Sequence, residues 1–344
     1  MPPPPAPQLF APADFLAAVR ARSLPVLDTR SPGEYTRGHL AGAHPLPLFT
    51  DDERARVGTT YKQVEPRQAL LLGLELVGPK MRWLVEEAER LAGGVGEVAL
   101  YCWRGGQRSA ATAWLLAQAG FTVARLAGGY KAYRRHARAF IDDLPFDLRV
   151  VDGLTGSGKT VFLHALEAAG AQVLDLEGIA NHKGSSFGLT PGDSQPTSEH
   201  AENLIYARLA GFDASRPVWV ENESRNVGKV FLPDGLVDAI AAGHRVELVV
   251  PTEDRVEHIV GQYGRYKRSV LADTFHHLRK RLGGQASQEA IAAVDAGDLH
   301  TATRIALRYY DKTYTHYSAR QAHPSSERHE VRIAELPELA RRLA

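Results

Sequence analysis

Eight residues from Gly153 to Thr160 have the types and spacing of a phosphate-binding loop. The segment reads Gly-Leu-Thr-Gly-Ser-Gly-Lys-Thr and matches G-x-x-x-x-G-K-[ST] at every fixed position, between an expected strand and an expected helix. Glycines let backbone N–H groups converge on phosphate oxygens, and the positive end of the helix dipole favours an anion. We therefore predict a phosphate or diphosphate site formed by Gly153, Gly156, Ser157, Gly158, Lys159 and Thr160.

An acidic residue at the end of a neighbouring strand often assists a metal ion at such a loop. In this motif Lys159 reaches a terminal phosphate and Thr160 can coordinate magnesium. Glu221 follows the expected strand 218–220, and Asp175 follows a second apolar run. Either carboxylate could instead cap a helix or face solvent. The motif specifies a diphosphate or triphosphate ester and does not specify ATP.

The second candidate site surrounds Cys102, the one cysteine in the chain, which excludes an internal disulfide and a multi-cysteine metal site. It opens the run Cys-Trp-Arg-Gly-Gly-Gln-Arg-Ser between an expected strand and helix. Arg104, Arg108 and the backbone amides at the helix start favour the nucleophilic thiolate. The expected anion cradle consists of Gly105, Gly106 and Gln107. The alternative is a buried structural cysteine.

Two successive α/β patterns position these sites. Apolar runs at 24–27, 98–101 and 123–126 predict buried strands, and the alanine-rich segment 110–119 predicts a helix. Strand, loop, helix and strand in this order predict a parallel sheet. A second series of expected strands lies at 148–151, 173–176, 218–220 and 246–250. From residue 254 onward the sequence predicts mostly helices.

Composition indicates a soluble globular protein of two domains. The chain has 344 residues, 44% of them hydrophobic and 24% charged, with a formal net charge of +1. This balance gives no chain-wide field for nucleic acid or a membrane. The first ten residues, MPPPPAPQLF, lack the basic flank and apolar core of a secretory signal. We therefore expect a cytoplasmic protein whose residues 1–10 form a disordered proline-rich tail.

Four segments of the first half together resemble a rhodanese domain. They are residues 28–35 (DTRSPGEY), residues 38–43 (GHLAGA), the Cys102 loop and residues 126–130 (LAGGY). In that family the cysteine carries transferable sulfur as a persulfide. Five residues separate Cys102 from Arg108, one more than in many rhodaneses. This spacing matches the C-x5-R cradle of cysteine phosphatases and suits a tetrahedral anion.

The chain as a whole resembles the tRNA 2-selenouridine synthase family, in which a rhodanese-like domain is fused to a P-loop domain. The resemblance is carried by residues 49–54, 58–63, 176–188 and 221–225. It implies an α/β fold with an N-terminal rhodanese-like parallel-sheet domain at 11–143. A P-loop NTPase-like α/β domain with a helical C-terminal extension is expected at 146–344.

The same resemblance implies a reaction and its partners. Selenium replaces sulfur in wobble 2-thiouridine of tRNA through an S-geranylated intermediate, with selenophosphate and geranyl diphosphate as substrates. The P-loop would bind the diphosphate, and Cys102 would assist selenium handling. No tightly bound cofactor is implied, magnesium is a candidate ion, and a selenophosphate-producing enzyme is a candidate partner. No membrane partner is expected.

Contact with tRNA requires a basic surface with aromatic side chains. Lys and Arg outnumber Asp and Glu between residues 255 and 312, with several tyrosines nearby. The candidate tRNA-binding residues are Arg265, Lys267, Arg268, Arg279, Lys280 and Arg281. Basic residues at 131, 134, 135 and 138 could extend this surface. The alternative is an ordinary solvated helical face.

The sequence is also compatible with three other functions. The longer cysteine loop is compatible with a cysteine phosphatase coupled to a P-loop phosphate-binding domain. A rhodanese-type sulfurtransferase would form a persulfide on Cys102 without any need for selenophosphate. A non-catalytic regulator would bind its ligands and tolerate Cys102→Ser.

Overall fold

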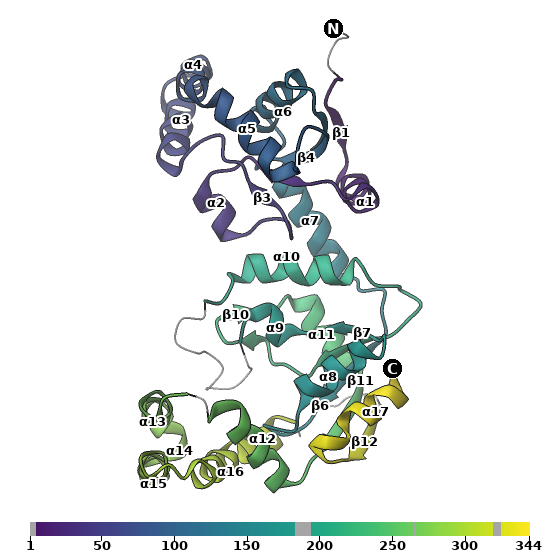
Figure 1. Cartoon of the computed structure of the whole chain (residues 1–344), viewed down its shortest axis with the longest axis vertical. Helices are drawn as coiled ribbons and strands as arrows, with labels where there is room; N and C mark the ends of the chain where they lie inside the picture. The colour runs from purple at the N-terminus through teal and green to yellow at the C-terminus, as the bar shows by residue number, and fades with distance from the viewer. Residues whose placement is uncertain (1–4, 183–193, 265, 319–324) are drawn as a thin grey trace. The chain divides into compact units, whose positions relative to one another are not determined.

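The computed structural model describes residues 5–182, 194–264, 266–318 and 325–344. The chain divides into two compact units, whose elements are labelled in Figure 1. The first unit comprises Met1–Phe140 with Glu202–Ala207, and the second comprises Ile141–Ala201 with Arg208–Ala344. A short segment from the second half of the sequence therefore belongs to the first unit, outside the span 11–143 expected for it.

A five-stranded parallel sheet in the order β1-β5-β4-β2-β3 forms the centre of the first unit. Its strands are β1 (Gln8–Phe10), β2 (Val26–Asp28), β3 (His44–Pro45), β4 (Glu97–Tyr101) and β5 (Thr122–Leu126). Strand β4 is buried from its second residue onward, as expected for a parallel strand covered on both faces. Leu27, Leu100 and Phe121 belong to the core on this sheet.

Helices follow most strands of the first unit. They are α1 (Pro12–Arg22), α2 (Pro32–Arg37), α3 (Asp51–Gln63), α4 (Pro66–Val77), α5 (Met81–Ala92), α6 (Gln107–Gln118) and α7 (Gly129–Asp142), with a 3₁₀ turn at Gly78–Lys80. Helix α6 packs against β4, β5 and α5, while α3 packs along α4 as a helical hairpin (Figure 1). The α6 contacts fix the loop that carries Cys102.

The expectation of a disordered tail is wrong for Gln8–Phe10, which form β1. This strand pairs in parallel with β5, with Gln8 opposite Ala124 and Phe10 opposite Leu126. The residues lack the long apolar run that identifies a strand in sequence. Their backbone hydrogen bonds depend on a partner more than a hundred residues away in the chain, so local pattern does not reveal them.

The second unit also contains a five-stranded parallel sheet, in the order β12-β11-β6-β8-β7. The strands are β6 (Leu148–Asp152), β7 (Gln172–Leu174), β8 (Val218–Glu221), β11 (His244–Val249) and β12 (Ser326–Glu330). Strands β9 (Asn226–Val227) and β10 (Val230–Phe231) form a small antiparallel pair. Strand β12 was not expected, because at this edge its residues alternate between exposed and half-buried and form no apolar run.

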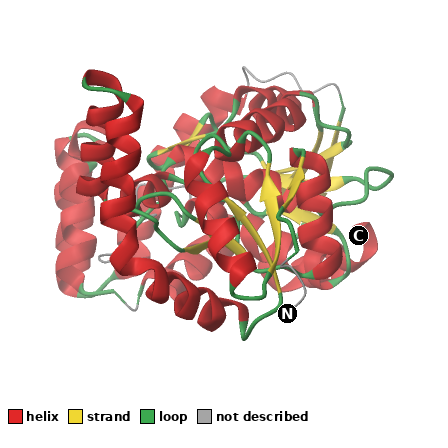
Figure 2. Cartoon of the chain, turned by 90° about the horizontal axis from the view of Figure 1, so that it is seen from above, coloured by secondary structure: helices red, strands yellow, loops and turns green. Residues whose placement is uncertain are grey.

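Helices make up most of the remaining described residues (Figure 2). Around the second sheet they are α8 (Lys159–Ala168), α9 (Leu176–Ala180), α10 (Ser198–Leu209), α11 (Asp234–Ala242), α12 (Thr252–Tyr263) and α17 (Leu336–Leu343), with a 3₁₀ turn at Ile333–Glu335. Helices α13 (Arg268–His277), α14 (Arg279–Leu282), α15 (Gly284–Ala296) and α16 (Leu299–Ser318) enclose a separate apolar core. The predicted α/β class with a helical C-terminal part is confirmed.

Across the described ranges, no helix combines the length and apolar character that crossing a lipid bilayer requires.

Candidate active sites

Cys102 lies directly after β4, at the carboxyl end of a central strand, and α6 begins five residues later at Gln107. Parallel α/β sheets place their ligand sites at this edge. Cys102 is 3% exposed, and its Sγ donates to the Ser109 hydroxyl oxygen over 3.2 Å. Ser109 in turn donates to the carbonyl of Gly106. The thiol is therefore held by a side chain of the first turn of α6.

A second turn, between β5 and α7, supports the Cys102 loop from behind. The backbone N–H of Tyr130 donates to the Cys102 carbonyl over 2.8 Å, and that of Lys131 donates to the Trp103 carbonyl over 3.0 Å. Gly129 has a φ of +60°, and a Cβ there would collide with the Cys102 carbonyl and the Gly105 nitrogen. A glycine is therefore required for the two turns to approach this closely.

Arg108 of the Cys102 loop forms a bidentate ion pair with Glu34 of α2, with N–O distances of 2.6 and 3.2 Å. Burial of Glu34 acts to raise its pKa, but the hydrogen bond and charge of Arg108 lower that pKa to about 2. Glu34 also accepts from the backbone N–H of Ser31. The structure thus places Arg108 on Glu34, while Arg104 is exposed along with Gly106 and Gln107.

A buried ionic network lies beneath the same loop. Arg30 donates from Nε and an Nη to the carboxylate of Asp28, and the Tyr101 hydroxyl donates to the same carboxylate over 2.6 Å. The guanidinium lies 3.8 Å from the ring centroid of Tyr130. Burial and the charge of Asp28 raise the pKa of Tyr101 well above its usual range. The pair is bidentate, which offsets part of the cost of burying two charges, although one Nη of Arg30 is buried without a hydrogen-bond partner among the described residues.

The phosphate-binding loop connects β6 to α8, the arrangement that its sequence predicts. The Lys159 Nζ donates to the Gly153 carbonyl over 2.9 Å, which directs the amine across the loop. Gly156 has a φ of +80°, and a Cβ there would collide with Ile259 of α12. The loop before α8 therefore has the positive-φ glycine that such a motif needs, and the start of a helix favours an anion.

Three glutamates lie beside this loop, and sequence reasoning identified only Glu221. The Thr160 hydroxyl donates to Glu177 over 3.1 Å, and the backbone N–H of Glu177 donates to Glu221 over 2.7 Å. Burial and the charge of Asp175 raise the pKa of Glu221 well above its usual range. Burial and the charge of Glu177 raise the pKa of Glu223 to about 7.

Glu177 and Glu223 each stand two residues after a carboxylate that the sequence singled out, Asp175 and Glu221. This two-residue spacing from a predicted carboxylate is the feature of the sequence that could have identified both glutamates. Asp175 itself accepts from the backbone N–H of Gly178 over 2.7 Å and lies 3.0 Å from His164. It therefore acts as the N-cap of α9.

Within the described residues, no group of three or more His, Cys, Asp or Glu side chains has the arrangement of a metal site. Magnesium usually binds proteins through one or two carboxylates, with phosphate oxygens and water completing its shell. The Thr160 hydroxyl and the neighbouring Glu177 fit that smaller requirement.

Arg255 of α12 ties the phosphate-binding loop to the C-terminal helices. It is 1% exposed, donates to the Thr155 carbonyl over 3.1 Å and forms a bidentate pair with Asp311 of α16 at 2.9 and 2.7 Å. Sequence reasoning missed this arginine because nothing local distinguishes it from other helical arginines.

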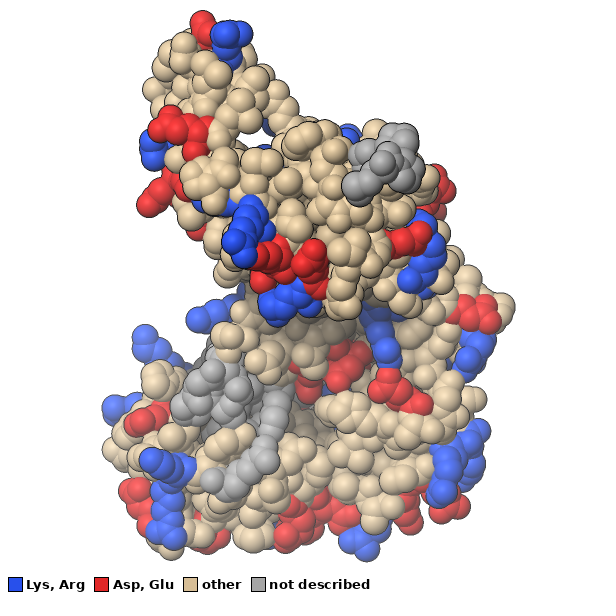
Figure 3. Space-filling model, turned by 45° about the horizontal axis from the view of Figure 1, so that its top comes forward, with Lys and Arg blue, Asp and Glu red and all other residues tan. Residues whose placement is uncertain are grey.

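The structure describes most of the candidate tRNA-binding residues. Lys267, Arg268, Arg279 and Lys280 are exposed. Arg268 also donates to the Asp295 carbonyl. Arg265 lies outside the described residues, and Arg281 lies in α14. On the face drawn in Figure 3, Lys and Arg are interspersed with Asp and Glu.

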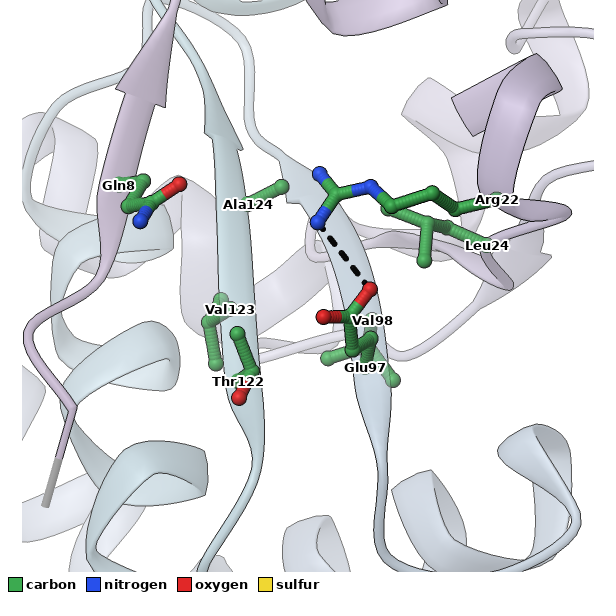
Figure 4. Close-up of a pocket in the computed structure, with 8 residues that line it drawn as sticks. All are labelled: Gln8, Arg22, Leu24, Glu97, Val98, Thr122, Val123 and Ala124. Atoms are coloured by element: carbon green, nitrogen blue, oxygen red, sulfur yellow. Dashed lines mark hydrogen bonds and ion pairs between the residues drawn. The ribbon is translucent and has the colours of Figure 1, made fainter. Parts of the chain in front are cut away.

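A small pocket lies at the amino ends of the strands of the first sheet, whereas Cys102 lies at their carboxyl ends. Glu97, Val98, Thr122 and Val123 line it at the amino ends of β4 and β5. Figure 4 shows Arg22 reaching across it to Glu97, with an N–O distance of 3.1 Å. The pocket is thus separated from the Cys102 loop by the length of β4.

Comparison with known proteins gives two family matches. Residues 146–335 match the model described as the tRNA 2-selenouridine synthase AAA domain, and residues 11–136 match the rhodanese-like domain. The first match covers the phosphate-binding loop and the second covers Cys102.

Relatives that align with most of the chain point to the same family. A tRNA 2-selenouridine synthase of Aeromonas salmonicida is 36% identical over 338 residues, covering 87% of this chain and 88% of the relative. One from Nitrosomonas europaea is 37% identical, covering 80% of this chain and 75% of the relative. Among solved structures, a thiosulfate sulfurtransferase from Pseudomonas aeruginosa is 16% identical, covering 73% of this chain and 53% of that one, with a TM-score of 0.21.

Proposed function

Because this chain belongs to the tRNA 2-selenouridine synthase family, we propose that it replaces the sulfur of 2-thiouridine in tRNA with selenium by way of an S-geranylated nucleoside. The observation that carries the proposal is the presence in one chain of two strand-to-helix loops whose residues suit an anion. One is the Cys102 loop at the carboxyl end of β4, and the other is the phosphate-binding loop before α8.

We assign geranylation to the phosphate-binding loop. The thiouridine sulfur forms a bond to C1 of geranyl diphosphate, the C1–O bond breaks, and the nucleoside loses its N3 proton. Lys159 and the amides that begin α8 stabilise the charge that develops on the departing diphosphate. Magnesium, held by the Thr160 hydroxyl and Glu177 together with phosphate oxygens, would supply further positive charge.

We assign selenium handling to the Cys102 loop. A new C2–Se bond forms, and the C2–S bond and the P–Se bond of selenophosphate break. Geranyl thiol leaves, N3 regains its proton, and water supplies the oxygen that converts the phosphoryl group to phosphate. Alkylation favours this step because an alkylated sulfur leaves more readily than a thiocarbonyl sulfur. Support comes from the backbone amides at the start of α6, which suit a tetrahedral anion beside the thiol.

Mass spectrometry of nucleosides tests both assignments. Purified protein is incubated with tRNA containing 2-thiouridine and with geranyl diphosphate, selenophosphate or both. We expect geranylated thiouridine with the first donor and selenouridine only when selenophosphate is present. Lys159→Ala should abolish geranylation, whereas Cys102→Ser should retain it and lose selenouridine. Lys229→Ala, a change at an exposed lysine, serves as the matched control.

The match of residues 11–136 to a rhodanese-like domain favours one second candidate, sulfur transfer through a Cys102 persulfide. Intact-mass measurement after incubation with thiosulfate would detect it as the mass of one added sulfur. Accumulation of the persulfide with unaltered thiouridine under every donor condition would replace the selenium assignment with this one.

A further inference from the structure

Helix α10 contributes a buried amide to the first unit. Asn203 belongs to the segment Glu202–Ala207, which the fold assigns to that unit, and it is 0% exposed. Its Nδ2 donates to the His39 carbonyl over 2.9 Å and to the Tyr130 hydroxyl over 2.8 Å. Its Oδ1 accepts from Arg134 over 2.7 Å. Both polar atoms of the side chain thus have partners, as a buried amide requires.

The contact with Tyr130 connects Asn203 to the cysteine loop. Tyr130 accepts from Asn203 at its hydroxyl, and its own backbone N–H donates to the Cys102 carbonyl over 2.8 Å. The ring of Tyr130 also lies against the guanidinium of Arg30, which donates to the Gly38 carbonyl over 2.6 Å. Asn203 therefore bonds to the turn behind the loop, through Tyr130, and also to His39, the residue after Gly38.

Contacts of Glu202 and Tyr206 also hold this part of α10 in place. Glu202 pairs with Arg134 over 2.9 Å and with Arg138 over 3.0 Å. Tyr206 packs edge-on against Tyr133, with ring centroids 5.6 Å apart. A change confined to the Asn203 amide should therefore alter its hydrogen bonds while leaving the helix docked.

We propose that Asn203 is a positioning residue for the Cys102 loop, supplied to the rhodanese-like unit by the half of the sequence that carries the P-loop. Acting through Tyr130, it sets the backbone of the loop and so the exposure and environment of the thiol. Its expected effect on selenium transfer rests on the proposed function, whereas its effect on thiol reactivity does not.

The test uses Cys102 as its own probe, since the chain has no other cysteine. The rate of alkylation by iodoacetamide is measured against pH in the full-length protein, well below its unfolding temperature, with Cys102→Ser as the blank. The variants are Asn203→Asp, which replaces the donor by an acceptor and can still pair with Arg134, and Tyr130→Phe, which removes only the hydroxyl. Glu202→Gln on the same helix is the control.

We expect Asn203→Asp and Tyr130→Phe to speed alkylation and shift its pH profile, because the loosened loop exposes a thiol that is now 3% exposed. Selenouridine formation should fall about tenfold, the order expected when a reacting group is slightly misplaced. Geranylation should stay at the wild-type level. Glu202→Gln should lower the unfolding temperature and leave the alkylation profile unchanged.

Wild-type alkylation rates and pH profiles in both folded variants would overturn the proposal, even if their unfolding temperatures fell, because Asn203 would then be structural only. If Asn203→Asp does not fold, the more conservative Tyr130→Phe decides the question by the same readout. If the wild type forms no selenouridine, the proposed function fails, but the alkylation profiles still decide the role of Asn203.

Discussion

Glu34 is the ion-pair partner of Arg108, the second arginine of the cysteine loop. A partly buried guanidinium without a counterion would be costly, and Glu34 supplies the counterion by accepting two hydrogen bonds from Arg108. The same carboxylate accepts a hydrogen bond from the backbone N–H of Ser31, the N-cap residue of α2, as in a capping box. One side chain therefore links the start of α2 to the start of α6.

This pairing predicts an acid-dependent loss of stability. The folded-state pKa of Glu34 is lowered from 4.5 to about 2, so its contribution is complete above pH 4.5 and is lost as the pH falls towards 2. Glu34→Gln should reduce the free energy of unfolding by about 1 kcal/mol at neutral pH and by progressively less in acid. Urea unfolding across a pH series measures this difference.

Glu86→Gln, which removes an exposed ion pair with Arg82, is the control and should leave the free energy of unfolding close to the wild-type value at every pH. A constant difference between Glu34→Gln and the wild type from pH 6 to pH 3 would contradict the prediction.

The raised pKa of Glu223 predicts a second pH effect, on diphosphate binding at the phosphate-binding loop. Its pKa is raised to about 7, so the side chain is largely protonated below that pH and gains a negative charge above it. Because that charge lies near Lys159, affinity for a diphosphate should fall as pH rises through 7. Calorimetric titration with inorganic diphosphate should show this decline in the wild type and a weaker decline in Glu223→Gln.

The exposed Glu338 provides the matched control, since Glu338→Gln removes a carboxylate on α17 and should keep the wild-type pH dependence. Equal pH dependence in Glu223→Gln and the wild type would assign the effect to another group.

At the scale of elements, α12 and α16 hold the phosphate-binding loop through one buried pair. Arg255 bonds to a loop carbonyl and to Asp311, so the loop conformation depends on where two C-terminal helices lie. The same two helices also share an exposed pair, Arg304 with Glu253, at 2.6 Å. The two pairs differ mainly in burial, which makes them a matched comparison.

Arg255→Met should lower the free energy of unfolding by about 3 kcal/mol, since it leaves Asp311 without its bidentate partner in a partly buried setting. It should also weaken diphosphate binding, because Thr155 loses its hydrogen bond. Arg304→Met should leave both the free energy of unfolding and diphosphate binding close to the wild-type values. Urea unfolding and calorimetric titration measure both effects, and similar results for the two variants would show that burial of Arg255 is unimportant.

At the scale of the whole molecule, the first unit is built from two separate stretches of the sequence. Residues 202–207 lie in the first unit although they come from the second half of the sequence. They cover aromatic side chains of α7, including Tyr130 at 0% and Tyr133 at 1% exposure. A boundary drawn between the two sheets therefore removes part of the first core.

A fragment of residues 1–143 should thus be less stable than the intact chain. Loss of the 202–207 segment exposes Tyr130 and Tyr133, and burying a large side chain contributes about 1.5–3 kcal/mol. We expect a lower unfolding temperature, increased binding of a hydrophobic dye and faster alkylation of Cys102 in the fragment. Adding residues 198–209 through a flexible linker should reverse these changes. A fragment with the properties of the intact chain would contradict this account.

The sequence alone determined the α/β class and the strand-to-helix context of both loops. Glycine spacing and the Lys-Thr pair identify the phosphate-binding loop, because backbone amides and a helix start recognise phosphate by local geometry. The apolar runs before Cys102 and Gly153 identify their strands, because buried parallel strands need such runs. These features depend on residues that are close together in the chain.

Tertiary structure decided which side chains meet across the chain. Glu34 lies 74 residues from Arg108, Asn203 lies 73 from Tyr130, and Arg255 lies 56 from Asp311. Strands β1 and β12 form only because a neighbouring strand offers its backbone. A hydrogen bond or ion pair between distant residues requires both partners to be brought into place by the packing of other elements, and no local pattern encodes that encounter.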